Sequence, residues 1–152
     1  MTRVQTVLFV CTGNTCRSPM AEAIAREMLD TGKVPGHGRE VFVASAGLAA
    51  WDGTPASGET VDALRRRGIA FEGHAKRLTP EMIRRATLVL AMTRSHLVGA
   101  RALVGGEPHQ DKVHLVDPSG DLDDPIGMGQ PAYDSLAARL DRVLPGRLAE
   151  LL

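Results

Sequence analysis

The sequence is poor in several features, and each shortage argues against a class of protein. Lysine plus arginine number 18 and aspartate plus glutamate also number 18, so the formal net charge is zero. Nucleic-acid-binding domains and membrane-surface proteins usually carry a basic excess, so we expect neither kind of partner. No segment approaches the roughly 18 consecutive apolar residues of a membrane-spanning helix. The composition is that of an ordinary soluble protein.

Cysteine is also scarce, and the sequence shows no export signal. There are two cysteines in 152 residues. Residues 1–4 lead directly into a strand-like run and lack the apolar stretch and cleavage site of a signal peptide. Both observations favour a reducing, cytoplasmic location. Because there is no repeat, linker or low-complexity tract, residues 1–152 are expected to form one domain, with a monomer as the simplest state.

Short apolar runs alternate with amphipathic segments along the chain. Continuous apolar runs predict strands covered on both faces, and apolar residues at helical spacing predict helices. Ser18 followed by Pro19 predicts an N-cap and a first helical residue. The alternation predicts an α/β fold with a parallel sheet and helices on both faces, with ligands beyond the carboxyl ends of the strands. The expected strands are 4–10, 41–47, 87–92 and 112–116, and the expected helices are 18–30, 55–67, a short helix from 79, 93–104 and 132–152.

Both cysteines lie in the loop after the first strand, within VLFVCTGNTCRSPMAE at residues 7–22. A short loop that feeds a helix N-terminus points several backbone N–H groups inward and, with the helix dipole, forms an anion site. Gly13 supplies a conformation that other residues reach only with strain, and Asn14 tolerates it next best. Arg17 adds a bidentate fork suited to phosphate oxygens, and the positive field favours the thiolate of Cys11. The loop therefore combines an oxyanion cradle with an activated nucleophile.

Three other interpretations explain fewer residues of this loop. A Walker A phosphate loop needs a lysine that is absent here. A zinc site needs more ligands than one pair of cysteines, and no histidine lies nearby in the sequence. Two merely buried cysteines would leave the glycine, the asparagine, the arginine and the Ser-Pro pair unexplained.

The sequence CTGNTCRSPMAE after VLFV resembles the phosphate loop of the low-molecular-weight protein-tyrosine phosphatase family. The resemblance covers essentially the whole chain, with further matches at residues 45–47, 74–77, 90–93 and 124–125. It implies a doubly wound, four-stranded parallel sheet with a phosphate-binding loop after the first strand. It also implies a phosphatase that needs no metal or other cofactor, acts on phosphorylated proteins and forms a phosphocysteine intermediate.

The resemblance assigns roles within the loop that the chemistry supports. Cys11 would attack phosphorus, Arg17 would bind the equatorial oxygens with the loop amides, and Ser18 would donate a hydrogen bond to the thiolate. The phosphate-binding residues expected from the motif are Thr12, Gly13, Asn14, Thr15, Cys16, Arg17 and Ser18.

Two further interactions of the loop are expected from the family. Asn14 would hold the loop in shape through Ser45 and His74, although His74 is equally well interpreted as an ordinary surface histidine. Cys16 could form a disulfide with Cys11 that blocks the nucleophile reversibly and protects it from irreversible oxidation. A simple packed thiol is the alternative for Cys16.

A general acid has to protonate the leaving group, and two Asp-Pro pairs are candidates. They begin at Asp117 and Asp124, in a turn-rich segment where an acid often has only a structural role. Spacing to the last helix, as in the family, favours Asp124. The same carboxylate would then activate the water that hydrolyses the phosphocysteine.

Thr15 bears on which phosphorylated side chain is the substrate. Tyrosine-directed members of the family commonly carry isoleucine here, whereas the form with threonine resembles the bacterial protein-arginine phosphatases. The hydroxyl of threonine suits a polar guanidinium group, whereas the apolar side chain of isoleucine suits an aromatic ring. Residues 126–129 after the second Asp-Pro pair include no aromatic residue, which agrees with phosphoarginine. Trp51 could wall the pocket, so phosphotyrosine stays open, as does Thr15 being an ordinary loop residue.

Two other functions are weaker. Arsenate reductases share this fold and loop but need additional cysteines, and this chain has none beyond Cys16. A phosphate-binding module without catalysis would not need Asp124. The basic run at 65–67 predicts a partner contact or, more simply, a solvated helix end.

Overall fold

Strands and helices alternate along the chain in the computed structural model, which describes residues 4–152. The strands form one parallel sheet in the order β2-β1-β3-β4, which confirms the α/β fold and the four-stranded sheet. Within the described residues, no helix is both long and apolar enough to cross a membrane. The elements are β1 (Gln5–Cys11), α1 (Arg17–Asp30), β2 (Val41–Gly47), α2 (Gly58–Arg65), α3 (Pro80–Arg85), β3 (Leu88–Ala91), α4 (Arg94–Leu103), the 3₁₀ helix η1 (Pro108–Lys112), β4 (Val113–Leu115) and α5 (Gln130–Leu151).

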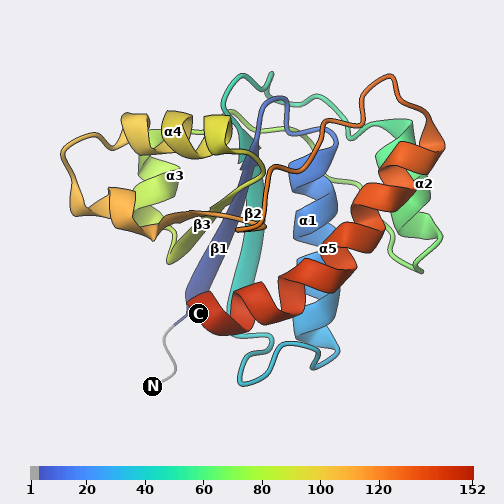
Figure 1. Ribbon diagram of the computed structural model, residues 1–152, viewed down its shortest axis with the longest axis horizontal. Helices are drawn as coiled ribbons and strands as arrows, with labels where there is room; N and C mark the ends of the chain where they lie inside the picture. The colour runs from blue at the N-terminus through green and yellow to red at the C-terminus, as the bar shows by residue number, and fades with distance from the viewer. Residues whose placement is uncertain (1–3) are drawn as a thin grey trace.

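Helices cover both faces of the sheet. Figure 1 shows α1, α2 and α5 on one face and α3 and α4 on the other. The central strand β1 supplies side chains to both layers: Val7 and Phe9 belong to the first core cluster, and Leu8 and Val10 belong to the second. Because successive side chains of a strand point to opposite faces, a strand buried on both sides has to be apolar throughout.

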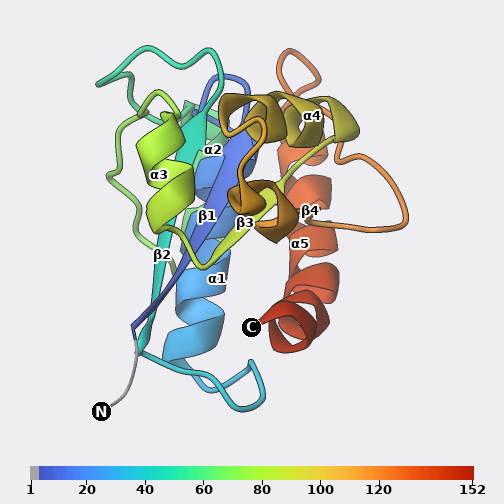
Figure 2. The same cartoon turned by 90° about the vertical axis from the view of Figure 1, so that its left-hand side faces the viewer.

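The chain changes its direction of winding at β1. β2 pairs with one edge of β1 and β3 pairs with the other. The loop after β1 and the start of α4, which follows β3, lie at the same upper edge of the molecule in both views (Figure 2). This is the switch point at which open parallel sheets bind their ligands.

Two helices begin after a threonine N-cap, at Thr79 as predicted and at Thr93. The hydroxyls of Thr79 and Thr93 accept backbone N–H groups at the starts of α3 and α4. Helix α2 starts at Gly58 instead of residue 55, because Ser57 is its N-cap and accepts the N–H of Thr60. Helix α5 starts two residues earlier than expected, and η1 was not predicted.

The prediction that Ser18 caps the first helix was wrong. Helix α1 begins at Arg17, its N-cap position is Cys16, and no side chain caps it. The hydroxyl of Ser18 lies instead 2.8 Å from the sulfur of Cys11. The first N–H groups of α1 are therefore not satisfied by a side-chain cap.

The basic run at 65–67 connects two helices. Arg66 pairs with Asp134 and Arg67 pairs with Asp141, so the end of α2 is tied to α5. These exposed pairs account for two of the three arginines without a partner protein.

Candidate active site

The loop between β1 and α1 turns through one left-handed residue. That residue is Asn14, with a φ of 57°, whereas Gly13 has no positive φ, so the role predicted for Gly13 was wrong. A glycine is needed instead at Gly47, the last residue of β2. A Cβ there would lie 2.3 Å from the carbonyl oxygen of Thr12 and 3.0 Å from the amide nitrogen of Asn14. The close approach of β2 therefore supports the loop backbone.

The sulfur of Cys11 is buried and hydrogen-bonded from within the loop. It lies 2.8 Å from the Ser18 hydroxyl, and the backbone N–H of Asn14 donates to it across 3.3 Å. Ser18 Oγ also accepts a hydrogen bond from the Asn14 amide at 2.8 Å. That bond uses one lone pair of the hydroxyl, so its proton stays available for the sulfur. Two polar groups of the loop therefore contact the sulfur.

The side chain of Asn14 joins the loop to its surroundings. Its Nδ2 donates to Ser18 and, at 2.9 Å, to Ser45, and its Oδ1 accepts the backbone N–H of Lys76 at 2.9 Å. Ser45 therefore contacts the Asn14 amide from β2. His74 is exposed, and the described hydrogen bonds of Asn14 do not include it. The segment around His74 supports the loop through the backbone of Lys76.

Glu22 extends this chain of hydrogen bonds and was not predicted from the sequence. Its buried carboxylate accepts a hydrogen bond from Ser45 Oγ at 2.7 Å and pairs with Arg26 at 2.8 Å. A chain of bonds therefore runs from Cys11 through Ser18, Asn14 and Ser45 to a buried acid. One signal was available: Glu22 stands four residues after Ser18, on the same face of α1.

Arg17 points toward the Asp-Pro loop. Its guanidinium is nearly buried, donates to the carbonyl of Leu122 at 3.1 Å, and lies 3.6 Å from Asp124 Oδ2. The Asp124 side chain is 49% exposed, and its other oxygen accepts the N–H of Ile126. The loosely held carboxylate of Asp124 can therefore reach a ligand at the loop.

Asp117 has a different environment. It is buried, pairs with Arg139 at 2.9 Å and accepts two hydrogen bonds from Ser119. Although burial raises the pKa of Asp117, the hydrogen bonds from Ser119 and the Arg139 guanidinium outweigh it and hold that pKa below its usual value. The contacts of Asp117 therefore stabilise the turn to which it belongs.

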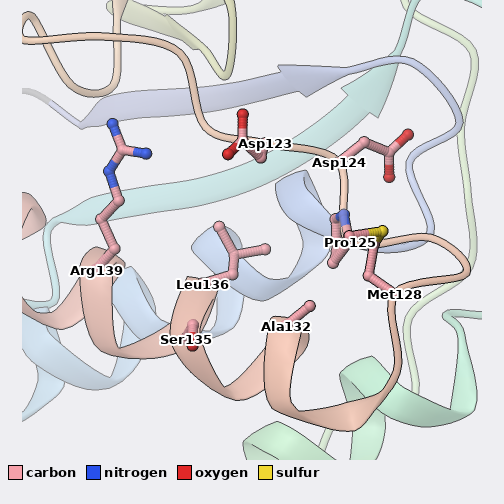
Figure 3. A pocket seen from close by; sticks show the side chains of 8 residues that line it. All are labelled: Asp123, Asp124, Pro125, Met128, Ala132, Ser135, Leu136 and Arg139. Atoms are coloured by element: carbon pink, nitrogen blue, oxygen red, sulfur yellow. The ribbon is translucent and has the colours of Figure 1, made fainter.

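A cavity of about 240 Å³ lies between the Asp-Pro loop and α5. Figure 3 shows that the neighbouring side chains Asp123 and Asp124 point in different directions from this loop. Arg139, at one end, is held by Asp117 and by the carbonyls of Gly120 and Asp121. The lining residues are Asp123, Asp124, Pro125, Met128, Ala132, Ser135, Leu136 and Arg139.

Cys16 is buried at the N-cap position of α1. Its sulfur lies 3.5 Å from the Tyr133 hydroxyl and 3.6 Å from that of Ser57, and both cysteines are free thiols. Burial and the adjacent Cys16 raise the pKa of Tyr133 well above its usual value. The next residue outward, Thr15, is half-buried, and its carbonyl accepts hydrogen bonds from Ser57 N–H and Thr60 Oγ1.

His96 is a second residue of the site that the sequence did not reveal. It lies in the first turn of α4, it is 5% exposed, and its Nε2 is 2.7 Å from Thr12 Oγ1. Burial, and next the charge of Arg17, lower the pKa of His96 to about 4. The imidazole is therefore neutral near pH 7. Its pairing with Thr12 depends on tertiary structure, and no sequence spacing signals it.

Trp51 stands on the turn after β2 and is 83% exposed. The turn is joined to the phosphate loop, because the N–H of Ala49 donates to the carbonyl of Thr12 at 3.0 Å. Trp51 also lines a shallow hollow with Asp52 and Arg77. The turn after β2 therefore presents an exposed aromatic side chain next to the phosphate loop.

The arrangement brings three kinds of chemistry together. Cys11 offers a buried sulfur with hydrogen-bond donors, Arg17 a guanidinium, and Asp124 a carboxylate within 3.6 Å of that guanidinium. Among residues 4–152, no group of three or more His, Cys, Asp or Glu side chains is placed to hold a metal ion. The constellation suits nucleophilic attack on a bound oxyanion.

Comparisons with known proteins match this chain over nearly its full length. A family model described as low molecular weight phosphotyrosine protein phosphatase matches residues 6–152. A protein-arginine-phosphatase of Bacillus subtilis (strain 168) is 36% identical over 143 residues, which cover 91% of each chain.

Solved structures agree with the sequence comparison. One is an arginine phosphatase, a cysteine-to-serine mutant with a phosphorylated active-site serine, which is 34% identical with a TM-score of 0.85 and covers 96% of this chain and 94% of its own. Another is a low molecular weight protein tyrosine phosphatase from T. tengcongensis, which is 40% identical with a TM-score of 0.83 and covers 97% of this chain and 99% of its own. Relatives with both substrate names are therefore similar to this chain.

Proposed function

Because the chain belongs to the low molecular weight phosphotyrosine protein phosphatase family, we propose that it is a cysteine-dependent phosphatase that hydrolyses phosphoarginine in proteins, as a single-domain monomer. Membership of the family makes a protein phosphatase the general activity. The proposal adds the substrate, the covalent intermediate and the roles of individual residues.

In the first step, the thiolate of Cys11 attacks phosphorus in line with the bond to the guanidino nitrogen. The S–P bond forms as the P–N bond breaks, and Arg17 and the loop N–H groups hold the three equatorial oxygens. The Ser18 hydroxyl stabilises the thiolate before attack. A phosphorylated serine at the active site of the similar arginine phosphatase mutant supports a covalent intermediate.

Asp124 is proposed to handle the protons. A bound phosphoryl group competes for the guanidinium of Arg17, and the released Asp124 carboxylate takes up a proton from water, which it then gives to the leaving nitrogen as the P–N bond breaks. The resulting carboxylate then takes a proton from water as the water oxygen attacks phosphorus. The S–P bond breaks, phosphate leaves and the Cys11 thiolate is regenerated. The partial exposure of Asp124 supports both proton transfers.

The observation that carries the choice of phosphoarginine is Thr15 in the phosphate loop. The side chain is half-buried, and its hydroxyl lies 3.7 Å from the sulfur of Cys16, within the same loop. A hydroxyl there can accept an N–H of the guanidinium, which an isoleucine cannot do. The name of the similar Bacillus subtilis relative supports the same substrate.

Phosphotyrosine is the second candidate, and the exposed Trp51 favours it. An indole on the turn beside the loop can stack on a phenol ring. On the Asp-Pro loop, the exposed apolar residues are Ile126 and Met128, which offer no aromatic face. The two substrates therefore make opposite demands on Thr15 and Trp51.

A paired measurement of kcat/KM on a phosphoarginine peptide and a phosphotyrosine peptide of the same sequence tests the proposal. We expect a strong preference for phosphoarginine and no turnover by the Cys11→Ser variant. Thr15→Ile should lower the phosphoarginine rate and preserve or raise the phosphotyrosine rate. A preference for phosphotyrosine in the unmodified enzyme, or a ratio unchanged by Thr15→Ile, would contradict the substrate assignment.

A further inference from the structure

Hydrogen bonds from several elements hold the phosphate loop, and one of them comes from α4, on the face of the sheet opposite α1 and α2. The turn after β2 holds Thr12 through the N–H of Ala49, and Ser45 holds Asn14. Ser57 and Thr60, at the start of α2, hold the carbonyl of Thr15. All of these come from elements on the β2 side of β1 or on the α1 face of the sheet.

The attachment to α4 is made by one side chain. Thr12 Oγ1 is bonded to His96 Nε2 at 2.7 Å, and His96 belongs to α4, which follows β3. Thr12 directly follows the nucleophile, so this bond fixes the first residue of the oxyanion cradle. Among the described side-chain hydrogen bonds of residues 12–16, it is the one that reaches α4.

The burial of His96 is costly unless the bond to Thr12 has a use. The other buried residues of α4 are Leu97 and Ala100, which pack in the apolar cluster on this face. His96 Nδ1 is buried and has no hydrogen-bond partner among the described residues. A buried polar atom without a partner destabilises a fold, so an apolar side chain would suit the core better. The use of the polar side chain is therefore its hydrogen bond to Thr12 in the phosphate loop.

We propose that His96 is a positioning residue for catalysis, which holds Thr12 and thereby the first peptide groups of the phosphate loop in the geometry that binds the transition state. The inference rests on the proposed phosphatase function. Loop N–H groups act most strongly on the charge that develops as phosphorus is attacked. A loosened Thr12 therefore lowers kcat more than it raises KM.

Four variants test this role with p-nitrophenyl phosphate. His96→Leu and Thr12→Val each remove the bond and should lower kcat about tenfold, with KM changed less than about twofold. The double variant should be no slower than the slower single variant, because both changes remove the same interaction. His96→Gln places an amide near the position of Nε2 and should recover kcat to within about threefold of the unmodified enzyme.

Oxyanion binding separates positioning from general damage to the fold. Vanadate mimics five-coordinate phosphorus, so its inhibition constant should rise about tenfold in His96→Leu, whereas that of inorganic phosphate should change less than about twofold. Leu97→Ala is the matched control, because Leu97 is about as buried as His96 on α4 but belongs to an apolar cluster that includes no residue of the loop. It should lower the melting temperature and leave kcat and vanadate inhibition unchanged.

Two results would overturn the inference. One is a kcat of His96→Leu within about twofold of the unmodified enzyme, and the other is a double variant whose loss is the product of the single losses. Failure of the proposed function would look different, since the unmodified chain would then show no turnover that depends on Cys11. In that case calorimetric binding of vanadate to the same variants still tests the role of His96.

Discussion

Single residues of one type take different roles in this molecule because their surroundings differ. Asp117 is buried against Arg139 and Ser119, whereas Asp124 is half-exposed and faces Arg17 across 3.6 Å. A general acid has to exchange protons with a ligand and with water, and the environment of Asp117 prevents this. The environment therefore distinguishes two Asp-Pro pairs that look alike in sequence.

Exchange of each acid for its amide separates the two roles. Asp124→Asn should lower kcat on phenyl phosphate about 100-fold or more, and much less on p-nitrophenyl phosphate, whose leaving group hardly needs a proton. Asp117→Asn should keep kcat within a few-fold but lower the free energy of unfolding by about 1–3 kcal/mol, because the ion pair with Arg139 is lost. The measurement is kcat on both esters, with urea unfolding as its companion. A larger loss of kcat in Asp117→Asn than in Asp124→Asn would show that Asp117 is the general acid.

The two cysteines predict a reversible response to oxidation. Peroxide converts the Cys11 thiolate to a sulfenic acid, and attack by the Cys16 thiolate then forms a disulfide and releases hydroxide. Dithiothreitol should restore the activity of the peroxide-treated enzyme. After the same treatment, Cys16→Ser should stay inactive because Cys11 oxidises further. Mass spectrometry of the treated protein checks for the disulfide, and irreversible inactivation of the unmodified enzyme would reject the prediction.

The sequence predicts local chemistry well and distant contacts poorly. Cys11, Arg17 and Ser18 lie within one loop, so the motif alone could indicate their association. Glu22 and His96 enter the site through Ser45 and Thr12, which are 23 and 84 residues away from them. Such pairings depend on strand order, and no local propensity encodes them.

At the scale of elements, the end of β2 fixes the phosphate loop by close contact. Gly47 pairs with Cys11 in the parallel sheet, and its position leaves no room for a side chain beside the Thr12 carbonyl. The residue is therefore part of the construction of the candidate site although it has no side chain. In the sequence motif SAG at residues 45–47, the glycine is needed because β2 approaches the loop backbone closely.

Gly47→Ala should damage stability and catalysis together. A methyl group 2.3 Å from a backbone oxygen forces the loop away from β2, and we expect a loss of about 1–3 kcal/mol in the free energy of unfolding. The displaced amides should also lower kcat at least tenfold. Gly58→Ala is the matched control, because a Cβ there meets nothing within 4 Å, and its stability should change by less than about 1 kcal/mol. Equal effects of the two substitutions would show that the contact is unimportant.

Element boundaries show where function overrides local preference. Ser18 and Pro19 predict an N-cap and a first helical residue, and the structure places the first helical residue two positions earlier, at Arg17. The hydroxyl of Ser18 is bonded to Cys11 and Asn14, so it cannot cap the helix as well. Uncapped N–H groups at a helix start are what a bound oxyanion needs. The predicted cap is wrong at the place where the proposed function needs free N–H groups for an oxyanion.

At the scale of the whole molecule, both halves of the sheet meet at one loop. The α1 face contributes the chain of bonds that ends at Glu22, and the α4 face contributes His96. The ion pairs of Arg66 and Arg67 join α2 to α5 behind the loop. Since each side of the loop is held by a different part of the fold, the geometry of the site depends on global folding.

His96 should make the stability of the whole molecule depend on pH. Its pKa in the folded protein is about 4, lowered by burial and then by Arg17, against 6.5 in an unfolded chain. The charged groups that act on it are Arg17, Asp121 and Asp124. Between pH 6.5 and 4, His96 therefore binds a proton in the unfolded chain but not in the folded chain. The contribution of His96 is fully present above about pH 6.5 and is lost as the pH falls toward 4.

The expected size of this effect follows from the difference in pKa. A shift of this size corresponds to about 3 kcal/mol, lost progressively between pH 6.5 and 4. In His96→Leu the group is absent, so the free energy of unfolding should fall less steeply over this range than in the unmodified protein. Urea unfolding at half-unit steps of pH measures both curves, and their difference isolates His96 from the other titrating groups. Leu97→Ala should shift the curve downward without changing its slope, whereas parallel curves for His96→Leu and the unmodified protein would mean that the imidazole is not held neutral by the fold.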